Sequence, residues 1–253
     1  MPLHVSLKKP LIWFATLCGL LPIMAGAHPI DDAQRTEIES IIHQYLIENP
    51  ELLEEMISAL RIREAAAAQA EAKKVIEEKH NQIFYPGSAF VAGNPKGDVT
   101  LVEFFDYTCS YCKESLKDVR RLMEQDNNLR VVFIDYPALS NRNPVSMVAT
   151  RASVAAANQG KYVPFHLKMM GSMMPLTQKS ILRYAKEVGL DEQQLLQDMN
   201  APETYARIDD NIALAHALGI DGTPSFVIGD NVIAGALGYD TLRQIIALMR
   251  SRR

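Results

Sequence analysis

From position 99 onwards, apolar residues gather into short continuous runs, which is the pattern of buried strands. Two such runs, 99–105 and 129–136, flank a segment at 112–126 whose apolar residues recur every three to four positions, as on one face of a helix. A strand, a crossover helix and a second strand form a β-α-β unit with parallel strands. The pattern therefore predicts an α/β fold.

After this unit the chain changes to helical spacing and then returns to strands. Glycines and prolines interrupt the helical part, and Thr223-Pro224 introduces the first of two short strands. The order β-α-β, helices, β-β-α assigns residues 86–253 to one main domain. Its later elements are a helical insertion at about 144–218, strands at 225–228 and 232–234, and a closing helix at about 240–250.

Residues 28–85 have another pattern, two helices with one apolar stripe each. Asp31 or Asp32 can cap the first helix, and Pro50 begins a second that continues to about His80. Two such helices cannot form a core alone. Because the later part of the second helix is mostly alanine and charged residues, we expect an oligomerisation stalk, forming a dimer or trimer, followed by a solvated spacer. The alternative is a helical hairpin folded back onto the same chain.

The first 27 residues have the features of an export signal. Two lysines precede an apolar stretch at 11–23, and an Ala-Gly-Ala sequence at 25–27 closes it like a cleavage site. The stretch is short for a membrane span, so we expect a signal peptide at 1–27 rather than an uncleaved membrane anchor. An exported chain reaches a compartment where disulfides persist. We expect this compartment to be the periplasm, and association with the outer membrane stays open.

Composition and charge narrow the classes of function. The 253 residues are 48% hydrophobic, which suffices for a core, and the formal net charge of −4 argues against a nucleic-acid partner. Of the three cysteines, Cys18 lies in the expected signal peptide, which leaves Cys109 and Cys112. One pair is too few to be a stabilising framework in an exported chain of this length. We therefore expect this pair to be redox-active.

The spacing of the cysteines suggests separate roles for them. Cys109 is expected in the first turn of a helix, where free backbone N–H groups and the helix dipole stabilise a thiolate and lower its pKa. Cys112 is expected one turn further in and more shielded, so Cys109 would attack and Cys112 would resolve. Structural zinc needs four ligands, and the sequence has no second cysteine pair and no closely spaced histidine pair. We expect no metal and no cofactor.

Three stretches resemble the DsbA family of thioredoxin-fold proteins, in the branch of the ScsC-like proteins. The first runs from Glu103 to Lys113 (EFFDYTCSYCK) and the second from Gly222 to Gly229 (GTPSFVIG). The third, residues 34–53, is similar to the N-terminal oligomerisation segment of ScsC-like proteins. The resemblance implies a thioredoxin-like fold with a helical insertion, preceded by a helical oligomerisation segment.

The resemblance also implies further site residues. Pro224 matches the cis-proline that faces the cysteines and presents backbone to a substrate peptide, and Thr223 precedes it. Glu103 matches an acidic residue beneath the cysteines that handles the proton of Cys112, although an ordinary glutamate at a strand edge is the alternative. Asp106 is common in this branch and has no assigned role.

The residues between the cysteines, Ser110 and Tyr111, are expected to contact substrate. Strongly oxidising members of the family typically carry Pro-His there, whereas a tyrosine in the second position and Thr223 before the proline resemble the isomerase branch. The resemblance therefore implies a disulfide isomerase that can also form disulfides. Its partners would be exported client proteins with cysteines, a membrane thiol–disulfide electron-transfer partner and further copies of this chain.

Two other functions stay open at the level of sequence. One is a copper-binding or chaperone-like periplasmic protein that uses the same cysteines, and the other is an envelope protein with an inert disulfide. We favour core packing as the role of four clustered methionines, Met169, Met170, Met173 and Met174. The alternatives are an adaptable surface for unfolded clients or soft ligands for copper(I). His166 is expected to be structural.

Overall fold

The computed structural model describes residues 31–87 and 90–252. The predicted signal peptide, residues 1–27, lies outside the described residues. The chain divides into two compact units, residues 1–57 and 58–253. Among the helices described, none is both long enough and apolar enough to cross a membrane.

The first unit contains α1 (Asp32–Glu48) and the beginning of α2 (Glu51–Glu78). A capping box starts α1, because Asp31 Oδ1 accepts a hydrogen bond from Gln34 N at 2.8 Å and Gln34 Oε1 accepts one from Asp31 N at 3.2 Å. Asn49 ends the helix, and its backbone N–H donates to the carbonyl of Tyr45. The two predicted helices and the break between them are confirmed. None of the α1 side chains is buried.

The described residues of the second unit are built on a five-stranded sheet with the order β1-β3-β2-β4-β5. Within this sheet β2 and β3 pair in parallel, and the other neighbouring strands pair antiparallel. This confirms the predicted β-α-β unit. The strands are β1 (Val91–Gly93), β2 (Val99–Phe105), β3 (Leu129–Asp135), β4 (Ser225–Ile228) and β5 (Asn231–Ala234).

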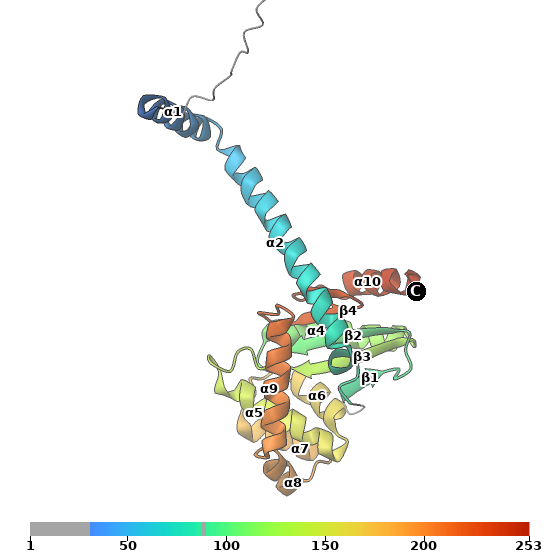
Figure 1. The fold of residues 1–253 in the computed structure, drawn as a ribbon. Helices are drawn as coiled ribbons and strands as arrows, with labels where there is room; N and C mark the ends of the chain where they lie inside the picture. The colour runs from blue at the N-terminus through green and yellow to red at the C-terminus, as the bar shows by residue number, and fades with distance from the viewer. Residues whose placement is uncertain (1–30, 88–89, 253) are drawn as a thin grey trace, which may run out of the picture. The chain divides into compact units, whose positions relative to one another are not determined.

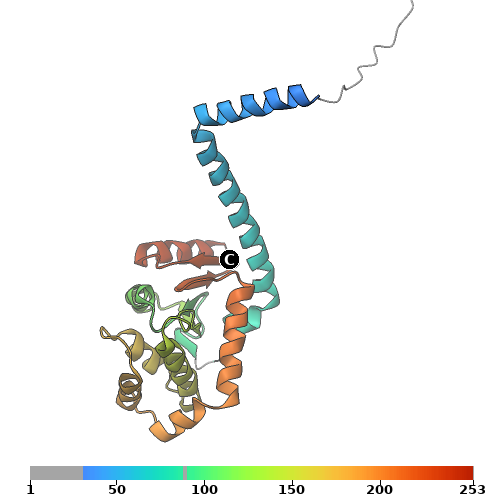
Figure 2. The same cartoon turned by 90° about the vertical axis from the view of Figure 1, so that its left-hand side faces the viewer.

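Helices cover both faces of the sheet (Figure 1, Figure 2). One face carries Leu101 and Phe105 and packs against α4 (Ser110–Gln125) and α10 (Tyr239–Ser251). The other face carries Val102 and Phe104 and packs against the end of α2, α3 (His80–Phe84) and α9 (Pro202–Ala217). Because side chains alternate along a strand, Glu103 lies on the face covered by α4. The predicted thioredoxin-like fold is confirmed.

The segment between β3 and β4 is helical, with a 3₁₀ turn at Ala157–Gln159. It packs where β2 and β3 end, and the ring of His166 lies 4.5 Å from that of Phe105 and 4.1 Å from that of Phe133. The helices are α5 (Pro144–Ala156), α6 (Tyr162–Met170), α7 (Gln178–Glu187), α8 (Glu192–Asp198) and α9 (Pro202–Ala217).

The last turns of α2 are not a solvated spacer, which corrects the expectation from their composition. Ala72 and Ile76 are buried. The side-chain amide of Gln69 donates to the carbonyl of Val232 on β5 at 2.6 Å. Ile76 packs with Val102 and Phe104 on this face of the sheet, so the last turns are docked on the domain while most of their polar side chains stay exposed.

Candidate active site

The end of β2 delivers the two cysteines to the start of α4. Cys109 is the N-cap of α4 and Cys112 lies in its first turn, and both are free thiols with little or no exposure. The Thr223–Pro224 peptide bond is cis, as the resemblance implied. Cys109 Sγ lies 3.2 Å from the carbonyl oxygen of Thr223 and, in its thiol form, donates a hydrogen bond to it. The structure thus brings together four of the predicted residues from two distant parts of the sequence.

The two sulfur atoms have opposite electrostatic surroundings. The pKa of Cys109 is lowered to about 6, chiefly by a hydrogen bond from the thiol of Cys112, helped by the backbone N–H groups of Cys112 and Tyr111 and opposed by burial. The pKa of Cys112 is raised far above its usual range by burial, by its hydrogen bond to Cys109 and by the nearby Glu103. At neutral pH Cys109 is therefore a thiolate and Cys112 a thiol. This arrangement suits a pair in which one sulfur attacks a disulfide and the other resolves the mixed disulfide that forms.

Glu103 lies on the central strand β2 beneath the cysteine helix and is 2% exposed. This position excludes an ordinary glutamate at a strand edge. Burial raises its pKa to about 8; the side chain of Ser115 on α4 opposes this rise, and the charge of Cys109 adds to it. A carboxyl group with this pKa exchanges its proton readily near neutral pH.

Asp106, for which the sequence suggested no role, fixes the loop that leads to Cys109. Its carboxylate is fully buried and accepts four hydrogen bonds. Oδ1 accepts from the backbone N–H and the hydroxyl of Thr108, both at 2.7 Å. Oδ2 accepts from Leu139 N at 2.9 Å and from the Ser146 hydroxyl at 2.7 Å. The loop before Cys109 is thereby tied to the start of the helical insertion.

A second buried polar cluster lies behind this loop and was not predicted. The Tyr107 hydroxyl forms a hydrogen bond with His166 Nδ1 at 3.1 Å, and the Tyr162 hydroxyl donates to Asp135 Oδ2 at 2.6 Å. Ser153 donates to the other oxygen of Asp135. Burial lowers the pKa of His166 to about 3, so the ring is neutral, in keeping with the structural role expected for it. A sequence signal existed only for Asp135, an acidic residue at the end of an apolar run.

The remaining predicted residues lie at the surface. Ser110 is exposed, and the Tyr111 side chain is 63% exposed at the start of α4. The methionines divide into two pairs. Met169 and Met170 fill the core, as favoured, whereas Met173 and Met174 are exposed.

A dithiol at the start of a helix, beside a cis-proline that precedes the neighbouring strand of a thioredoxin-like sheet, defines a thiol–disulfide oxidoreductase of the thioredoxin fold. The profile of the DSBA-like thioredoxin domain matches residues 100–247, and that of the copper resistance protein ScsC N-terminal domain matches residues 34–67. The chain belongs to the DsbA-like family of thiol–disulfide oxidoreductases.

Comparison with known proteins supports the same assignment. A thioredoxin-like oxidoreductase from Silicibacter pomeroyi DSS-3 is 42% identical, with a TM-score of 0.63 over 68% of this chain and 97% of that one. ScsC from Proteus mirabilis, in a transitional conformation, is 25% identical, with a TM-score of 0.63 over 88% of this chain and all of the other.

Among curated relatives, the Na⁺/H⁺ antiporter NhaA of Herminiimonas arsenicoxydans is 32% identical over 166 residues, which are 64% of this chain. This chain spans about a quarter of the length of that relative. The similarity therefore concerns one part of a much longer protein.

Proposed function

We propose that this protein is an exported, periplasmic thiol–disulfide oxidoreductase that isomerises disulfide bonds in client proteins and can also form them. The observation that carries the proposal is the difference between the two sulfur atoms. Cys109 is a thiolate at neutral pH because its pKa is lowered to about 6, while the buried Cys112 keeps its proton. Cys109 Sγ also lies 3.2 Å from the carbonyl of Thr223, next to the cis peptide bond.

The reaction begins when the Cys109 thiolate attacks a client disulfide. A bond forms between Cys109 and one client sulfur, and the other client sulfur leaves as a thiolate. In isomerisation a different client thiolate then attacks the mixed disulfide and releases Cys109. Alternatively Cys112 attacks Cys109, which releases the client reduced and leaves the protein pair as a disulfide. Disulfide formation is the reverse of this second route.

Glu103 and the cis-proline loop have supporting roles in this proposal. Cys112 must lose its proton before it can attack, and Glu103, whose pKa is about 8, is the carboxyl group placed beneath it. Thr223 and Pro224 present backbone to the client, and the exposed Ser110 and Tyr111 contact it from the opposite side. An imidazole between the cysteines would stabilise the Cys109 thiolate further. Its absence favours an isomerase over a strong oxidase.

An oligomer fits this function. Apolar side chains of the stalk segment are exposed, among them Ile41 at 61% and Met56 at 63%, and exposed apolar stripes of this kind bind partners. The match of residues 34–67 to the ScsC N-terminal domain supports the same interpretation. Several sites facing one client would favour repeated exchange of its disulfides. A dimer or trimer, and a membrane partner that supplies electrons to the pair, are part of the proposal.

Recovery of activity from scrambled ribonuclease tests the isomerase activity. The reduced protein should restore ribonuclease activity, and Cys109→Ser should abolish the effect. No recovery with the unaltered protein would remove the isomerase part, and normal recovery with Cys109→Ser would remove the site assignment. Anaerobic titration with copper(I) examines the copper-binding alternative. Stoichiometric binding that survives dialysis, without any disulfide exchange, would favour that alternative.

A further inference from the structure

A hollow beside the first turns of α4 has no part in the thiol chemistry described above. It has a volume of about 440 Å³ and begins at Ser110, the residue after Cys109. One wall is α4, and the other is the segment from Met170 to Met173 that follows α6. A client bonded to Cys109 is therefore within reach of this hollow.

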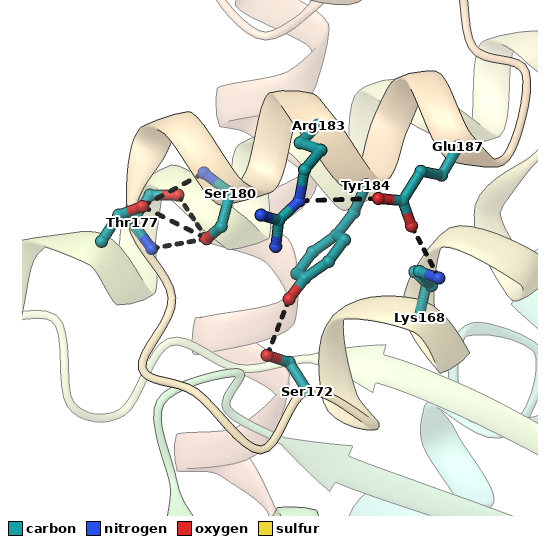
Figure 3. Close-up of polar contacts among 7 residues, drawn as sticks. All are labelled: Lys168, Ser172, Thr177, Ser180, Arg183, Tyr184 and Glu187. Carbon is teal, nitrogen blue, oxygen red and sulfur yellow. Dashed lines mark hydrogen bonds and ion pairs between the residues drawn. The ribbon is translucent and has the colours of Figure 1, made fainter.

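The second wall is held in place by specific hydrogen bonds. Lys113 Nζ, on the cysteine helix, donates to the carbonyl of Ser172 at 2.9 Å. The Ser172 hydroxyl donates to the carbonyl of Met174 at 3.0 Å. It also lies 2.9 Å from the Tyr184 hydroxyl (Figure 3). Because the single hydroxyl proton of Ser172 is used by Met174, Tyr184 must be the donor in that second contact. The wall is thus connected both to the cysteine helix and to α7.

α7 is itself anchored around Tyr184 (Figure 3). Glu187 pairs with Lys168 on α6 at 2.6 Å and with Arg183 at 3.5 Å. A capping box between Thr177 and Ser180 fixes the start of the helix. These contacts give the segment after α6 a defined shape, although Met173, Met174 and Pro175 are exposed.

The hollow has an apolar rim at Met173, whose side chain lines it and is 91% exposed. Met174, the next residue, is 71% exposed, in contrast to the buried Met169 and Met170. Tyr111, which follows Ser110 on α4, is 63% exposed. Flexible thioether side chains adapt to many apolar partners, so this rim suits varied polypeptide sequences.

Positive charge lines the wall formed by α4. Lys113, Lys117 and Arg120 follow one another at intervals of four and three residues, which places them on one face of the helix. Glu114 is the one acidic residue that lines the hollow, so the wall carries an excess of positive charge. The chain as a whole has a formal net charge of −4. The positive wall is therefore a local feature and favours an acidic occupant.

We propose that this hollow binds a segment of the client polypeptide that carries an acidic and an apolar residue close to its reactive cysteine. The proposal rests on the proposed function and specifies which clients the site prefers. Along α4, Lys117 and Arg120 lie roughly 12–16 Å from Cys109 at the α-helical rise per residue. An extended peptide covers about 3.3 Å per residue, so the acidic residue should lie roughly three to five positions from the client cysteine.

Synthetic peptides test this proposal. Each carries one cysteine as a mixed disulfide with 2-mercaptoethanol, a methionine next to it, and either aspartate or asparagine four positions away, on one side or the other. The rate at which each peptide oxidises the reduced protein is measured at low ionic strength. For one of the two placements, N-terminal or C-terminal to the cysteine, we expect the aspartate peptide to react roughly three- to tenfold faster than the asparagine peptide. The ratio should decrease as salt is added.

A charge-reversal variant and a matched control complete the test. Lys117→Glu with Arg120→Glu should abolish or invert the preference. Lys179→Glu with Lys186→Glu, which changes the net charge equally on exposed positions of α7, should retain it. The ratio of two peptides within one variant does not depend on the fraction of active protein. Equal rates for the aspartate and asparagine peptides in both placements would overturn the proposal. The same rate ratio in the charge-reversal variant and in the control variant would also overturn it.

Two controls decide whether a negative result concerns the hollow or the thiol chemistry. If the unaltered protein also fails to react with 2-hydroxyethyl disulfide, the proposed function is wrong, rather than the client preference. Dimerisation that depends on Lys117 and Arg120 would show that the hollow binds a second copy of the chain, and it would overturn the proposal as well.

Discussion

Glu103→Gln should stabilise the reduced protein at neutral pH while slowing the step that uses Cys112. Burial raises the pKa of Glu103 to about 8 from the ordinary 4.5. Between these pH values the folded state holds a proton that the unfolded state has released, so the free energy of unfolding falls as pH rises, by about 1.4 kcal/mol per pH unit. The accumulated decrease in the free energy of unfolding is about 3 kcal/mol at pH 7 and below about 1 kcal/mol at pH 5. Glutamine is neutral at both values and removes this loss.

Urea unfolding of the reduced protein, followed by circular dichroism, measures the effect. The one tryptophan, Trp13, lies in the expected signal peptide, so tryptophan fluorescence is not an alternative for the mature chain. At pH 7, Glu103→Gln should raise the free energy of unfolding by about 3 kcal/mol, and at pH 5 by less than about 1 kcal/mol. Glu114→Gln, an exposed position on the same helix as the cysteines, is the control and should change neither value.

At pH 8 and above, where Glu103 is largely ionised and can accept the proton of Cys112, the same variant should resolve mixed disulfides slowly. A positioned proton acceptor contributes roughly 10²–10⁴ to a rate. Rapid quenching followed by mass spectrometry would show the complex between Cys109 and a client accumulating. A lower free energy of unfolding at pH 7, or an unchanged dependence on pH, would contradict the account of Glu103 as a buried carboxyl group with a raised pKa. Unchanged resolution would remove its part in proton transfer.

Three other predictions concern the cysteine pair, the loop before it and the stalk. Absorbance of the thiolate at 240 nm should titrate with a pKa of about 6 for Cys109, and Cys112→Ala should raise that pKa because its largest cause is lost; an unchanged value would contradict this. Asp106→Asn places an amide group against a backbone N–H donor and should lower the free energy of unfolding by about 2–4 kcal/mol. Thermal melts measure this loss, and Asp118→Asn, at a partly exposed position, is the control that should leave the stability unchanged. Removing all residues before 58 should leave a redox-active monomer by light scattering, and an unchanged assembly state would refute the stalk.

Local patterns predicted most of the secondary structure because each element carries its own signal. The apolar run at 99–105 and the spacing at 112–126 depend only on neighbouring residues, and both elements formed within two residues of expectation. β1 was missed because it has three residues and pairs only with β3 at the sheet edge. It ends at Gly93, where φ is 68° and a Cβ would lie 2.6 Å from the carbonyl oxygen of Leu129. Such a short edge strand is held by its hydrogen bonds to the neighbouring strand, and its sequence has no periodicity from which it could be predicted.

The candidate site was predictable only in part, for a related reason. The Cys-x-x-Cys spacing is local, but Thr223 is 114 residues from Cys109 and entered through family resemblance. The hydrogen bonds of Asp106 and of the cluster around Asp135 join residues up to 59 positions apart, and sequence alone offers no sign of such pairings. The contact between Gln69 and β5 could not be predicted either, since the composition of this part of α2 indicated a solvated helix.

The redox potential of the Cys109/Cys112 pair tests the central claim most directly. Dithiols whose attacking cysteine has a pKa near 7 have potentials of about −270 mV, and those with a pKa near 3.5 have about −120 mV. A pKa of about 6 for Cys109 therefore predicts roughly −250 to −200 mV in a glutathione titration, with no transition in Cys109→Ser. A potential below about −300 mV would identify an inert structural disulfide and contradict the account.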